Sequence, residues 1–351
     1  MLNVLIGNDF WGAGNFGDDL MLEGFVSWRA RHDLDWRISI LCAHDIAAMR
    51  ARFPIFNWIA ANESSRAEAL EWADVWLVIG GSVFQSDVGP WLLDRIAEDL
   101  TNAARRSIPA FLVGVGLNNV DALATEQART IHKLASAIWV RDVRCLEAML
   151  SAGFSHEKVR LGADVAHLAF SGRAKQEQLS GVAACLIDES EVPDCLAIAR
   201  VLRDHDSSLT WLCQEVRHLT GSELSLYQLI PSGLTANFKL SCLDYRLATL
   251  GNMFEEFQRF ETLLTSRYHM TMAGAWAGSR VAVYDRNAKL TGIREELGLV
   301  ECSNLCSEDA IALALKNATM ADRATLHSCA ARAEQMLDQF AAAANGMSGR
   351  R

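Results

Sequence analysis

The sequence lacks the features that mark several classes of protein. No apolar run among its 351 residues reaches the roughly 18 residues that a membrane-spanning helix needs. The N-terminus has no basic segment followed by a long apolar one, so we predict no signal peptide and a cytoplasmic protein, which could also lie peripherally at the inner face of the membrane. The formal net charge is −10, and nucleic acid, which binds basic faces, is not an expected partner.

Metal-binding cysteine patterns are also missing. The nine cysteines include no Cys-x-x-Cys pair, and Cys302 with Cys306 has no second pair that would complete a zinc site. Their odd number and scattered positions are typical of small core residues in a reducing compartment. We therefore expect neither a metal nor a bound cofactor.

What is present is a globular composition that is long enough for two domains. Half of the residues are hydrophobic and 22% are charged, and a chain of 351 residues exceeds one ordinary core. The polar stretch 171–180 is the best candidate for a linker. We predict an N-terminal domain over 1–170 and a C-terminal domain over 171–351.

Short apolar runs alternate with helical patterns along the chain. In the first domain strands are expected at Leu2–Ile6, Arg37–Leu41, Asp74–Ile79, Pro109–Leu117, Ala137–Val140 and Lys158–Asp164, the last including its loop. In the second, strands are expected at Gly181–Ile187 and Leu209–Cys213, and helices at Val192–Arg203, Glu223–Leu229 and Asn252–Phe260, with two more over Ser307–Ala344. This alternation implies an α/β fold with parallel sheets covered by helices on both faces.

Glycines follow several of these strands. Residues 7–20 hold four glycines and lead into a helix that we expect to begin after Asp19. No Gly-Lys-Ser/Thr follows, so this loop is not a P-loop. Gly12–Gly17 matches Gly-x-Gly-x-x-Gly, but we discount the match because Asp18 and Asp19 would repel a pyrophosphate at the helix start. Gly80-Gly81-Ser82 also follows a strand, at the crevice where open α/β sheets bind ligands.

One short unit carries the strongest chemical pattern. We predict a helix over Met270–Ala277 that ends at Gly278, followed by a buried strand over Val281–Tyr284. Arg267 and His269 stand at the helix start, where unpaired N–H groups and the helix dipole favour an anion. Arg267 could bind a carboxylate or phosphate, and His269 could move a proton near neutral pH. The alternative is that His269 is a cap and Arg267 is solvated.

Six short motifs occur in one order along residues 1–289. They are Asn15-Phe16-Gly17-Asp18-Asp19, Gly80-Gly81-Ser82-Val83-Phe84-Gln85, Val140-Arg141-Asp142, Gly162-Ala163-Asp164, Ser266-Arg267-Tyr268-His269 and the segment Tyr284–Lys289. Together they resemble the polysaccharide pyruvyl transferase family. Ser82 stands where the family commonly has a third glycine, and Arg280 lies near the place of a common proline.

The resemblance implies a fold and a reaction. The fold would be two Rossmann-like domains facing a cleft, similar to GT-B glycosyltransferases, with the acceptor on the N-terminal side and the donor on the C-terminal side. The reaction would transfer the pyruvyl group of phosphoenolpyruvate to hydroxyls of a sugar in a surface polysaccharide or its precursor, which could be lipid-linked, and release phosphate. The alternatives are a nucleotide-sugar glycosyltransferase of the same fold and a non-catalytic glycan-binding protein.

The resemblance also suggests roles on the donor side. The family's Arg-x-His motif matches Arg267 and His269, and its Arg-Asp motif matches Arg141 and Asp142. Pyruvyl transfer must protonate the enol carbon of the donor, so an acid is needed beside a multiply charged anion. His269 fits this role, because a nearby phosphate and carboxylate would favour its charged form. Arg267 and Arg141 would bind donor oxygens.

On the acceptor side the sugar hydroxyl needs a base. Asp18 is the first candidate and Asp164 the second, while the structural alternative for Asp18 is that it caps the following helix. For Asp164 we favour a structural role. Gly80 and Gly81 would let the backbone approach the acceptor, with tight turns as the alternative. The other residues expected to bind the acceptor are Asn15, Gly17 and, with the base role, Asp164.

Overall fold

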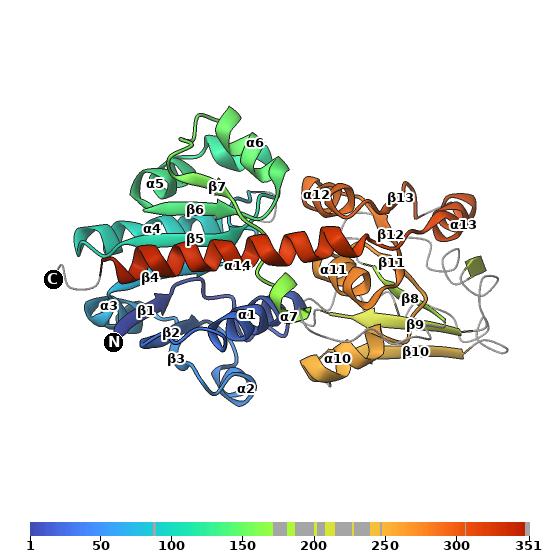
Figure 1. Cartoon of the computed structure of the whole chain (residues 1–351), viewed down its shortest axis with the longest axis horizontal. Coiled ribbons are helices and arrows are strands. Elements are labelled where there is room, and N and C mark those ends of the chain that lie inside the picture. Colours follow the sequence, from blue (N-terminus) through green and yellow to red (C-terminus); the bar gives the residue numbers. More distant parts are fainter. Residues whose placement is uncertain are drawn as a thin grey trace. The chain divides into compact units, whose positions relative to one another are not determined.

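The computed structural model describes residues 1–86, 89–170, 181–186, 200–201, 208–214, 227, 239–245, 248–305 and 307–347 (Figure 1). The chain forms two compact units: unit 1 is Met1–Ala13, Met21–Ala169 and Ser328–Arg351, and unit 2 is Gly14–Leu20 and Phe170–His327. This grouping differs from the ranges 1–170 and 171–351, because residues 14–20 and Phe170 belong to unit 2 and residues 328–351 to unit 1. The predicted linker 171–180 lies outside the described residues.

Unit 1 is built on a seven-stranded sheet in which every pair of neighbours is parallel. Its strands are β1 (Leu2–Ile6), β2 (Trp36–Cys42), β3 (Asn57–Ala60), β4 (Val75–Ile79), β5 (Ala110–Val115), β6 (Ala137–Val140) and β7 (Val159–Leu161), in the order β3-β2-β1-β4-β5-β6-β7. The six strands predicted here are confirmed, and β3 was not predicted. This edge strand buries only Trp58, so it has no apolar run to reveal it.

Helices cover both faces of this sheet. They are α1 (Phe16–Arg29, with residues 16–20 in unit 2), α2 (Ile46–Arg52), α3 (Glu63–Trp72), α4 (Trp91–Arg105), η1 (Val120–Ala124), α5 (Glu126–Leu134), α6 (Val143–Ser151), α7 (His167–Phe170) and α14 (Arg323–Asn345). Side-chain caps fix several starts: the oxygens of Asn62, Thr125 and Asp142 accept backbone N–H bonds at α3, α5 and α6. None of the helices that the structure describes is long and apolar enough to cross a membrane.

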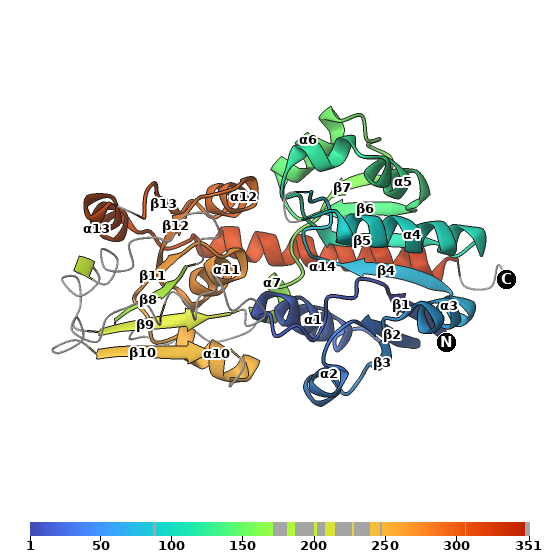
Figure 2. The same cartoon turned by 180° about the vertical axis from the view of Figure 1, so that it is seen from behind.

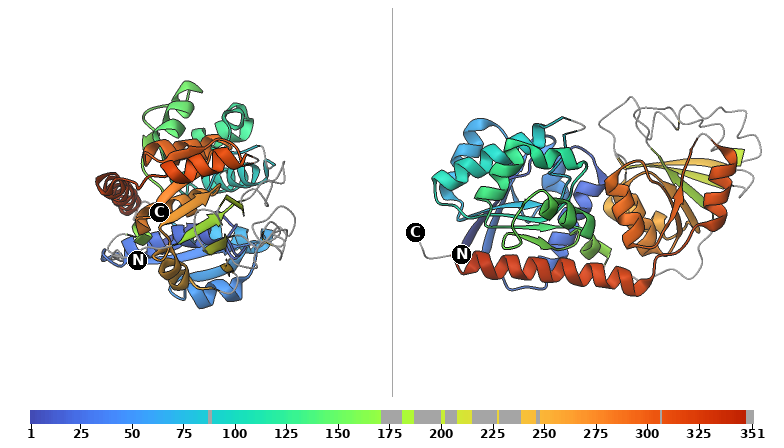
Figure 3. Two further views of the ribbon diagram at one scale, coloured as in Figure 1. Left: turned by 90° about the vertical axis from the view of Figure 1, so that its right-hand side faces the viewer. Right: turned by 90° about the horizontal axis from the view of Figure 1, so that it is seen from above.

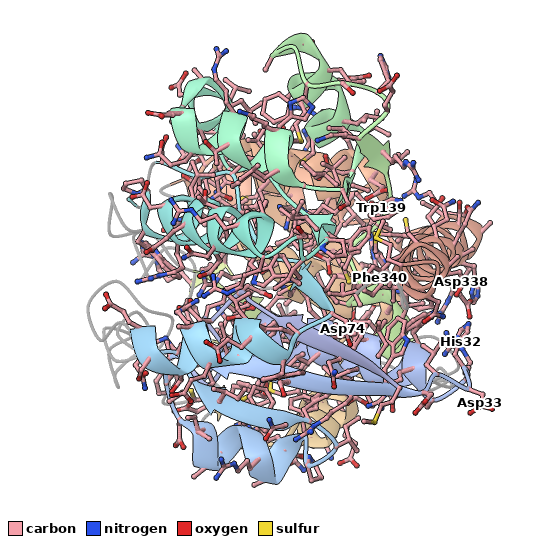
Figure 4. The ribbon with its side chains drawn as sticks, turned by 90° about the vertical axis from the view of Figure 1, so that its left-hand side faces the viewer. His32, Asp33, Asp74, Trp139, Asp338 and Phe340 are labelled. Atoms are coloured by element: carbon pink, nitrogen blue, oxygen red, sulfur yellow. The ribbon has the colours of Figure 1, made fainter. Side chains whose placement is uncertain are left out.

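The C-terminal helix α14 explains why residues 328–345 belong to unit 1. It runs along the face of the sheet opposite α4 (Figure 3). Phe340 packs edge-on against Phe111, 5.4 Å between ring centroids, and Trp139 Nε1 donates to Gln339 at 3.1 Å (Figure 4). Asp338 accepts from Trp28 Nε1 at 2.8 Å. Buried aromatic rings with a satisfied polar edge therefore hold the last helix to the first sheet.

Unit 2 has a six-stranded sheet, again parallel throughout (Figure 2). Its strands are β8 (Val182–Cys185), β9 (Ser208–Cys213), β10 (Lys239–Asp244), β11 (Thr262–Thr265), β12 (Arg280–Tyr284) and β13 (Val300–Cys302), in the order β10-β9-β8-β11-β12-β13. The helices described here are α10 (Leu250–Phe257), α11 (Tyr268–Ala277), α12 (Ala288–Glu296) and α13 (Glu308–Asn317). The helices predicted at 192–203 and 223–229 fall almost wholly outside the described residues.

Helix α11 and its flanking strands form as the sequence predicts. Gly278 ends the helix with a φ of 84°, a left-handed conformation that favours glycine. Gly274 lies so close to β11 that an added Cβ would be 2.6 Å from the Leu263 side chain, so this helix packs tightly on the sheet. The helix tail over Ser307–Ala344 is also confirmed, as α13 and α14.

Each sheet reverses its strand order once. In unit 1 the chain starts at β1, builds outward to β3 and returns to the other side of β1 with β4. In unit 2 the chain starts at β8, builds outward to β10 and returns to the other side of β8 with β11. In open α/β sheets the crevice at the carboxyl ends of such strands is the usual ligand site. The carboxyl edge of each sheet, at its reversal, is therefore a candidate ligand site.

Candidate functional site

The carboxyl edge of the unit 2 sheet carries the start of α11. The Arg267 N–H donates to Thr265 Oγ1 at 3.0 Å, and Thr265 Oγ1 donates to the Cys185 carbonyl at 3.0 Å. Arg267 takes the N-cap position but makes no side-chain capping bond, so its guanidinium is not used to close the helix. The half-buried Arg267 thus stands at the positive end of the helix dipole, next to the first-turn N–H groups, and this combination is suitable for an anion.

His269 lies in the first turn of α11 and is 7% exposed. Its imidazole packs directly against Gly17: a Cβ added to Gly17 would lie 2.0 Å from Nδ1. The Tyr268 ring stands edge-on to the imidazole, with 5.2 Å between centroids. Position 17 therefore requires glycine, because any side chain there would collide with the histidine ring. This packing role differs from the acceptor binding predicted for Gly17, which stays a prediction.

The segment 14–20 is fixed to unit 2 by contacts on both sides of Gly17. The Phe16 N–H donates to the Gln214 carbonyl at 2.9 Å, and the Phe16 ring contacts Tyr245 and Phe257, with centroids 5.4 Å and 6.0 Å away. The Tyr245 hydroxyl donates to Asp19 Oδ2 at 2.6 Å. The first turn of α1 is thereby held at the carboxyl edge of the unit 2 sheet.

The start of α1 differs from the sequence prediction. The helix begins at Phe16, four residues before the expected start at Leu20, because Asn15 Oδ1 accepts from the N–H groups of Gly17 at 2.8 Å and Asp18 at 3.4 Å. Asn15 is thus the cap, and capping by Asp18 is wrong. Asp18 is half-buried within the first turn, one residue from Gly17. The acceptor role of Asn15 and the base role of Asp18 stay predictions.

Three further residues at this edge were missed as site residues. Asp19 is buried and bonded to Tyr245, as described above. Gln214 directly follows β9 and is 4% exposed, and its Oε1 has no hydrogen-bond partner within the described part of the chain. Lys289, in the first turn of α12, places Nζ 5.5 Å from the Tyr268 ring centroid. The rule that ligands meet the carboxyl ends of strands could have found Gln214, since its strand was predicted.

Arg141, Asp142 and Asp164 lie in unit 1. The Arg141 side chain is 1% exposed, with Nε 3.5 Å from Asp142 Oδ2 and Nη1 3.9 Å from Asp164 Oδ2. Asp142 also caps α6 through the Cys145 N–H at 2.7 Å, and burial, together with the Asp142 charge, raises the pKa of the Cys145 thiol to about 12. Asp164 accepts from the Ala166 N–H at 3.0 Å. These contacts suit a structural network, and the ligand roles of Arg141 and Asp164 stay predictions.

Gly80 and Gly81 follow β4 in unit 1 with φ values of 60° and 79°. Only glycine adopts this left-handed backbone without strain. A Cβ on Gly80 would lie 2.0 Å from Met21 Sδ, and one on Gly81 would lie 3.0 Å from the Phe10 ring. Tight turns packed against protein side chains account for both glycines, so their contact with an acceptor stays a prediction.

The structure thus sorts the predicted residues into two groups. Unit 2 brings together Asn15, Gly17, Asp18, Arg267 and His269, and unit 1 holds Gly80, Gly81, Arg141 and Asp164. Over the described ranges no three His, Cys, Asp or Glu side chains are placed to hold a metal ion. The chemistry of the unit 2 edge is that of a cationic helix start with a buried imidazole, able to hold an anion and to exchange a proton with it.

Comparison with known proteins gives the fold and the family profile. A sequence model of the polysaccharide pyruvyl transferase family matches residues 15–284. Among solved structures, the UDP-GlcNAc 2-epimerase from Methanocaldococcus jannaschii is similar with a TM-score of 0.66 and 12% identity, covering 97% of this chain and 99% of that one. The UDP-N-acetylglucosamine 2-epimerase from Rickettsia bellii is similar with a TM-score of 0.66 and 12% identity, covering 100% of this chain and 99% of that one. Acinetobacter baumannii MurG is similar with a TM-score of 0.54 and 11% identity, covering 99% of this chain and 100% of that one.

Identities this low show the fold alone. That fold is the predicted class, α/β with two Rossmann-like domains, GT-B-like. No curated protein matches the chain.

Proposed function

The chain belongs to the polysaccharide pyruvyl transferase family, and on that premise we propose that it transfers the pyruvyl group of phosphoenolpyruvate to hydroxyls of a sugar in a surface polysaccharide or its precursor. The observation that carries the proposal is the pair Arg267 and His269 at the start of α11, one a cation and the other a proton carrier. No bound cofactor is needed, because the donor itself supplies the activated pyruvyl group.

Donor binding is assigned to the unit 2 edge. Phosphoenolpyruvate carries a phosphate and a carboxylate, and both are ligands for a guanidinium fork and for helix N–H groups. Arg267 supplies the fork and Lys289 a second cation over the Tyr268 ring. Gln214 supplies an amide whose buried oxygen and nitrogen positions can exchange by a flip, so it can donate to an anion. Arg141, the other predicted donor ligand, is assigned no step.

Proton transfer is assigned to His269 and Asp18. The first sugar hydroxyl bonds to C2 of the enol while His269 gives its proton to C3, which becomes a methyl group, and Asp18 takes the proton of the hydroxyl. A second hydroxyl then bonds to C2 as the bond from C2 to the phosphate oxygen breaks. Neutral His269 takes the proton of this second hydroxyl, and the phosphate leaves with the proton that Asp18 holds. One ketal forms and one phosphate leaves. Asp19 is the weaker candidate for the base, because its carboxylate already accepts from Tyr245.

The nucleotide-sugar glycosyltransferase remains the alternative. It would draw on the likeness to a UDP-GlcNAc 2-epimerase, one structure of which holds UDP-GlcNAc and UDP, but that likeness, at 12% identity, extends to the fold only. The family match instead favours the pyruvyl donor.

The test is release of phosphate from phosphoenolpyruvate by the purified chain with and without a panel of neutral glycans. We expect release only when an acceptor is present, together with a glycan product that has gained one pyruvyl ketal by mass. A thermal melt separates the donors, because only a ligand that binds the folded state raises the midpoint: phosphoenolpyruvate should raise it and UDP-sugars should not. Stabilisation by UDP-sugars alone would favour the glycosyltransferase, and stabilisation by a glycan alone would favour a binding protein.

A further inference from the structure

The carboxyl edge of the unit 1 sheet continues past its strands as a second small ladder. The segment after β4 runs beside the segment after β5 and is bonded to it: Gly116 N–H to the Gly81 carbonyl at 2.8 Å, Phe84 N–H to the Gly116 carbonyl at 3.3 Å, and Asn118 N–H to the Phe84 carbonyl at 3.0 Å. A parallel bridge joins Phe84 and Leu117. We call residues 81–85 and 116–118 the polar ladder; its backbone is fixed by these bonds.

Side chains on the polar ladder have hydrogen-bonding capacity that the protein does not use. Ser82 Oγ and Asn118 Oδ1 are both buried, and neither has a hydrogen-bond partner among the residues that the structure describes. Asn118 Nδ2 donates to Gln85 Oε1 at 3.3 Å, and Gln85 is 8% exposed. More than nine in ten buried polar groups in proteins are paired, so two unpaired atoms on one rigid ladder indicate a ligand.

The side chains that surround the ladder identify the class of ligand. Ser82, Gln85 and Asn118 are uncharged and offer both donors and acceptors, as sugar hydroxyls require. Phe10 lies against Gly81 and packs on the buried Trp11, with 4.6 Å between centroids, so an aromatic ring borders the ladder. Such a mixture of amides, a hydroxyl and aromatic rings suits a polyhydroxyl ring more than a phosphate.

The charges near the ladder also disfavour an anion. Arg66 is bonded to both Asp9 and Asp99, and the Arg141 guanidinium, which packs against Gly116, lies beside Asp142 and Asp164. Each cation thus faces two carboxylates. Within the described part of the chain, these two arginines are thus matched by carboxylates, which makes this edge less favourable for a phosphate or a nucleotide.

We propose that Ser82, Gln85 and Asn118 bind the hydroxyls of an uncharged sugar at the carboxyl ends of β4 and β5. Ser82 Oγ accepts from or donates to one sugar hydroxyl, and Asn118 Oδ1 accepts from another. Gln85 holds Asn118 in place by accepting from its Nδ2. Naming this sugar the acceptor of the reaction rests on the proposed function; the binding of the sugar does not.

The test measures sugar binding directly. Saturation-transfer NMR on the full chain would use methyl glycosides of galactose, glucose and mannose, neutral disaccharides of the same sugars, and UDP as the anionic probe. We expect at least one neutral sugar to bind, and Ser82→Ala and Asn118→Ala each to weaken it by about 3- to 10-fold, the range for one hydrogen bond. Asn102→Ala, an amide on α4 away from the ladder, is the matched control and should not change the binding.

Stability separates binding from a structural role. Ser82→Ala removes a hydroxyl that bonds to no described atom, so the melting midpoint should stay within about 2 °C of wild type. The proposal is overturned if no neutral sugar binds, if the variants bind it like wild type, or if UDP is the ligand that they lose. Sugar binding that depends on Ser82 but yields no phosphate release would refute the transferase and leave this site intact.

Discussion

The carboxyl edges of the two sheets have the same backbone plan and different chemistry. In unit 2 the edge presents Arg267, Lys289 and His269 at two helix starts. Asp18 and Asp19 lie there too, in the first turn of a third helix, where the dipole stabilises acids. At the unit 1 edge Arg66 and Arg141 each face two carboxylates, and the atoms with unused hydrogen-bonding capacity include an uncharged amide and a hydroxyl, Asn118 and Ser82. Under the proposed function, one fold repeated twice would serve an anionic donor at one edge and a neutral acceptor at the other.

The largest expected effect is on the imidazole. His269→Ala removes the proposed acid at the unit 2 edge, so phosphate release should fall by about 10²- to 10⁴-fold, the usual contribution of a positioned acid. His156→Ala, an exposed histidine in unit 1, is the control and should release phosphate like wild type. Equal rates for the two variants would mean that His269 does not act as the acid.

Gly17→Ala should produce the next largest effect. The new Cβ would need the space of His269 Nδ1, so the imidazole or the first turn of α1 must move, and a shift of about 1 Å can cost about 10²-fold in rate. Gly251→Ala in α10 is the matched control, because its Cβ would meet only Thr249 Oγ1, at 3.5 Å. That control should keep full activity and melt at the same or a higher temperature, since alanine favours a helix. Full activity in Gly17→Ala would show that the packing against His269 is unimportant.

A smaller effect is expected from Lys289. Lys289→Ala removes one partly screened cation, so the affinity for phosphoenolpyruvate should fall by about 3- to 10-fold, with less change in the rate at saturating donor. Lys316→Ala, an exposed lysine on α13, should leave the affinity unchanged. Sugar binding at the polar ladder should be the same in both variants. A loss of sugar binding in Lys289→Ala would contradict the assignment of donor and sugar to different edges.

The smallest effect on activity, but a clear one on stability, concerns Asp99 in unit 1. Burial raises the pKa of Asp99 from 3.8 to about 7, with the Asp9 charge adding to the shift and Arg66 opposing it. Because the folded state then binds the proton more tightly, this carboxyl stabilises the fold most below pH 4, and its contribution is lost as the pH rises from about 4 to about 7. Asp99→Asn should flatten that part of the melting profile and be no less stable than wild type at pH 8. The exposed Asp94→Asn should keep the wild-type slope, and a wild-type slope in Asp99→Asn would refute the shift.

Most of the fold could be predicted from local pattern. Continuous apolar runs such as Val75–Ile79 and Ala137–Val140 become strands because both faces of a parallel sheet are buried. Strand β3 was not predicted, because only Trp58 in it is buried. The start of α1 was misplaced, because the acidic pair Asp18-Asp19 indicated a helix start later than the cap at Asn15. The local sequence pattern predicts a strand when the strand is fully buried. It fails at the edge strand of a sheet and at the ends of helices.

The site could be predicted only in part. Arg267 and His269 are separated in sequence only by Tyr268, so the predicted helix start revealed both. The bond between Tyr245 and Asp19 joins residues 226 positions apart, and no local pattern indicates such a pairing. The same holds for Gly17, whose glycine is required by the His269 ring rather than by its own loop. Which polar atoms stay unpaired, such as Ser82 Oγ, depends on packing that only the structure gives.

The most direct test of the division between the two edges is a calorimetric titration of phosphoenolpyruvate into wild type, Arg267→Ala and Ser82→Ala. If the donor binds at the start of α11, Arg267→Ala should lose at least about tenfold in affinity, because a charge-assisted bond to the anion is gone, and Ser82→Ala should bind like wild type. The account would be contradicted if Arg267→Ala kept its affinity for phosphoenolpyruvate, or if Ser82→Ala lost it.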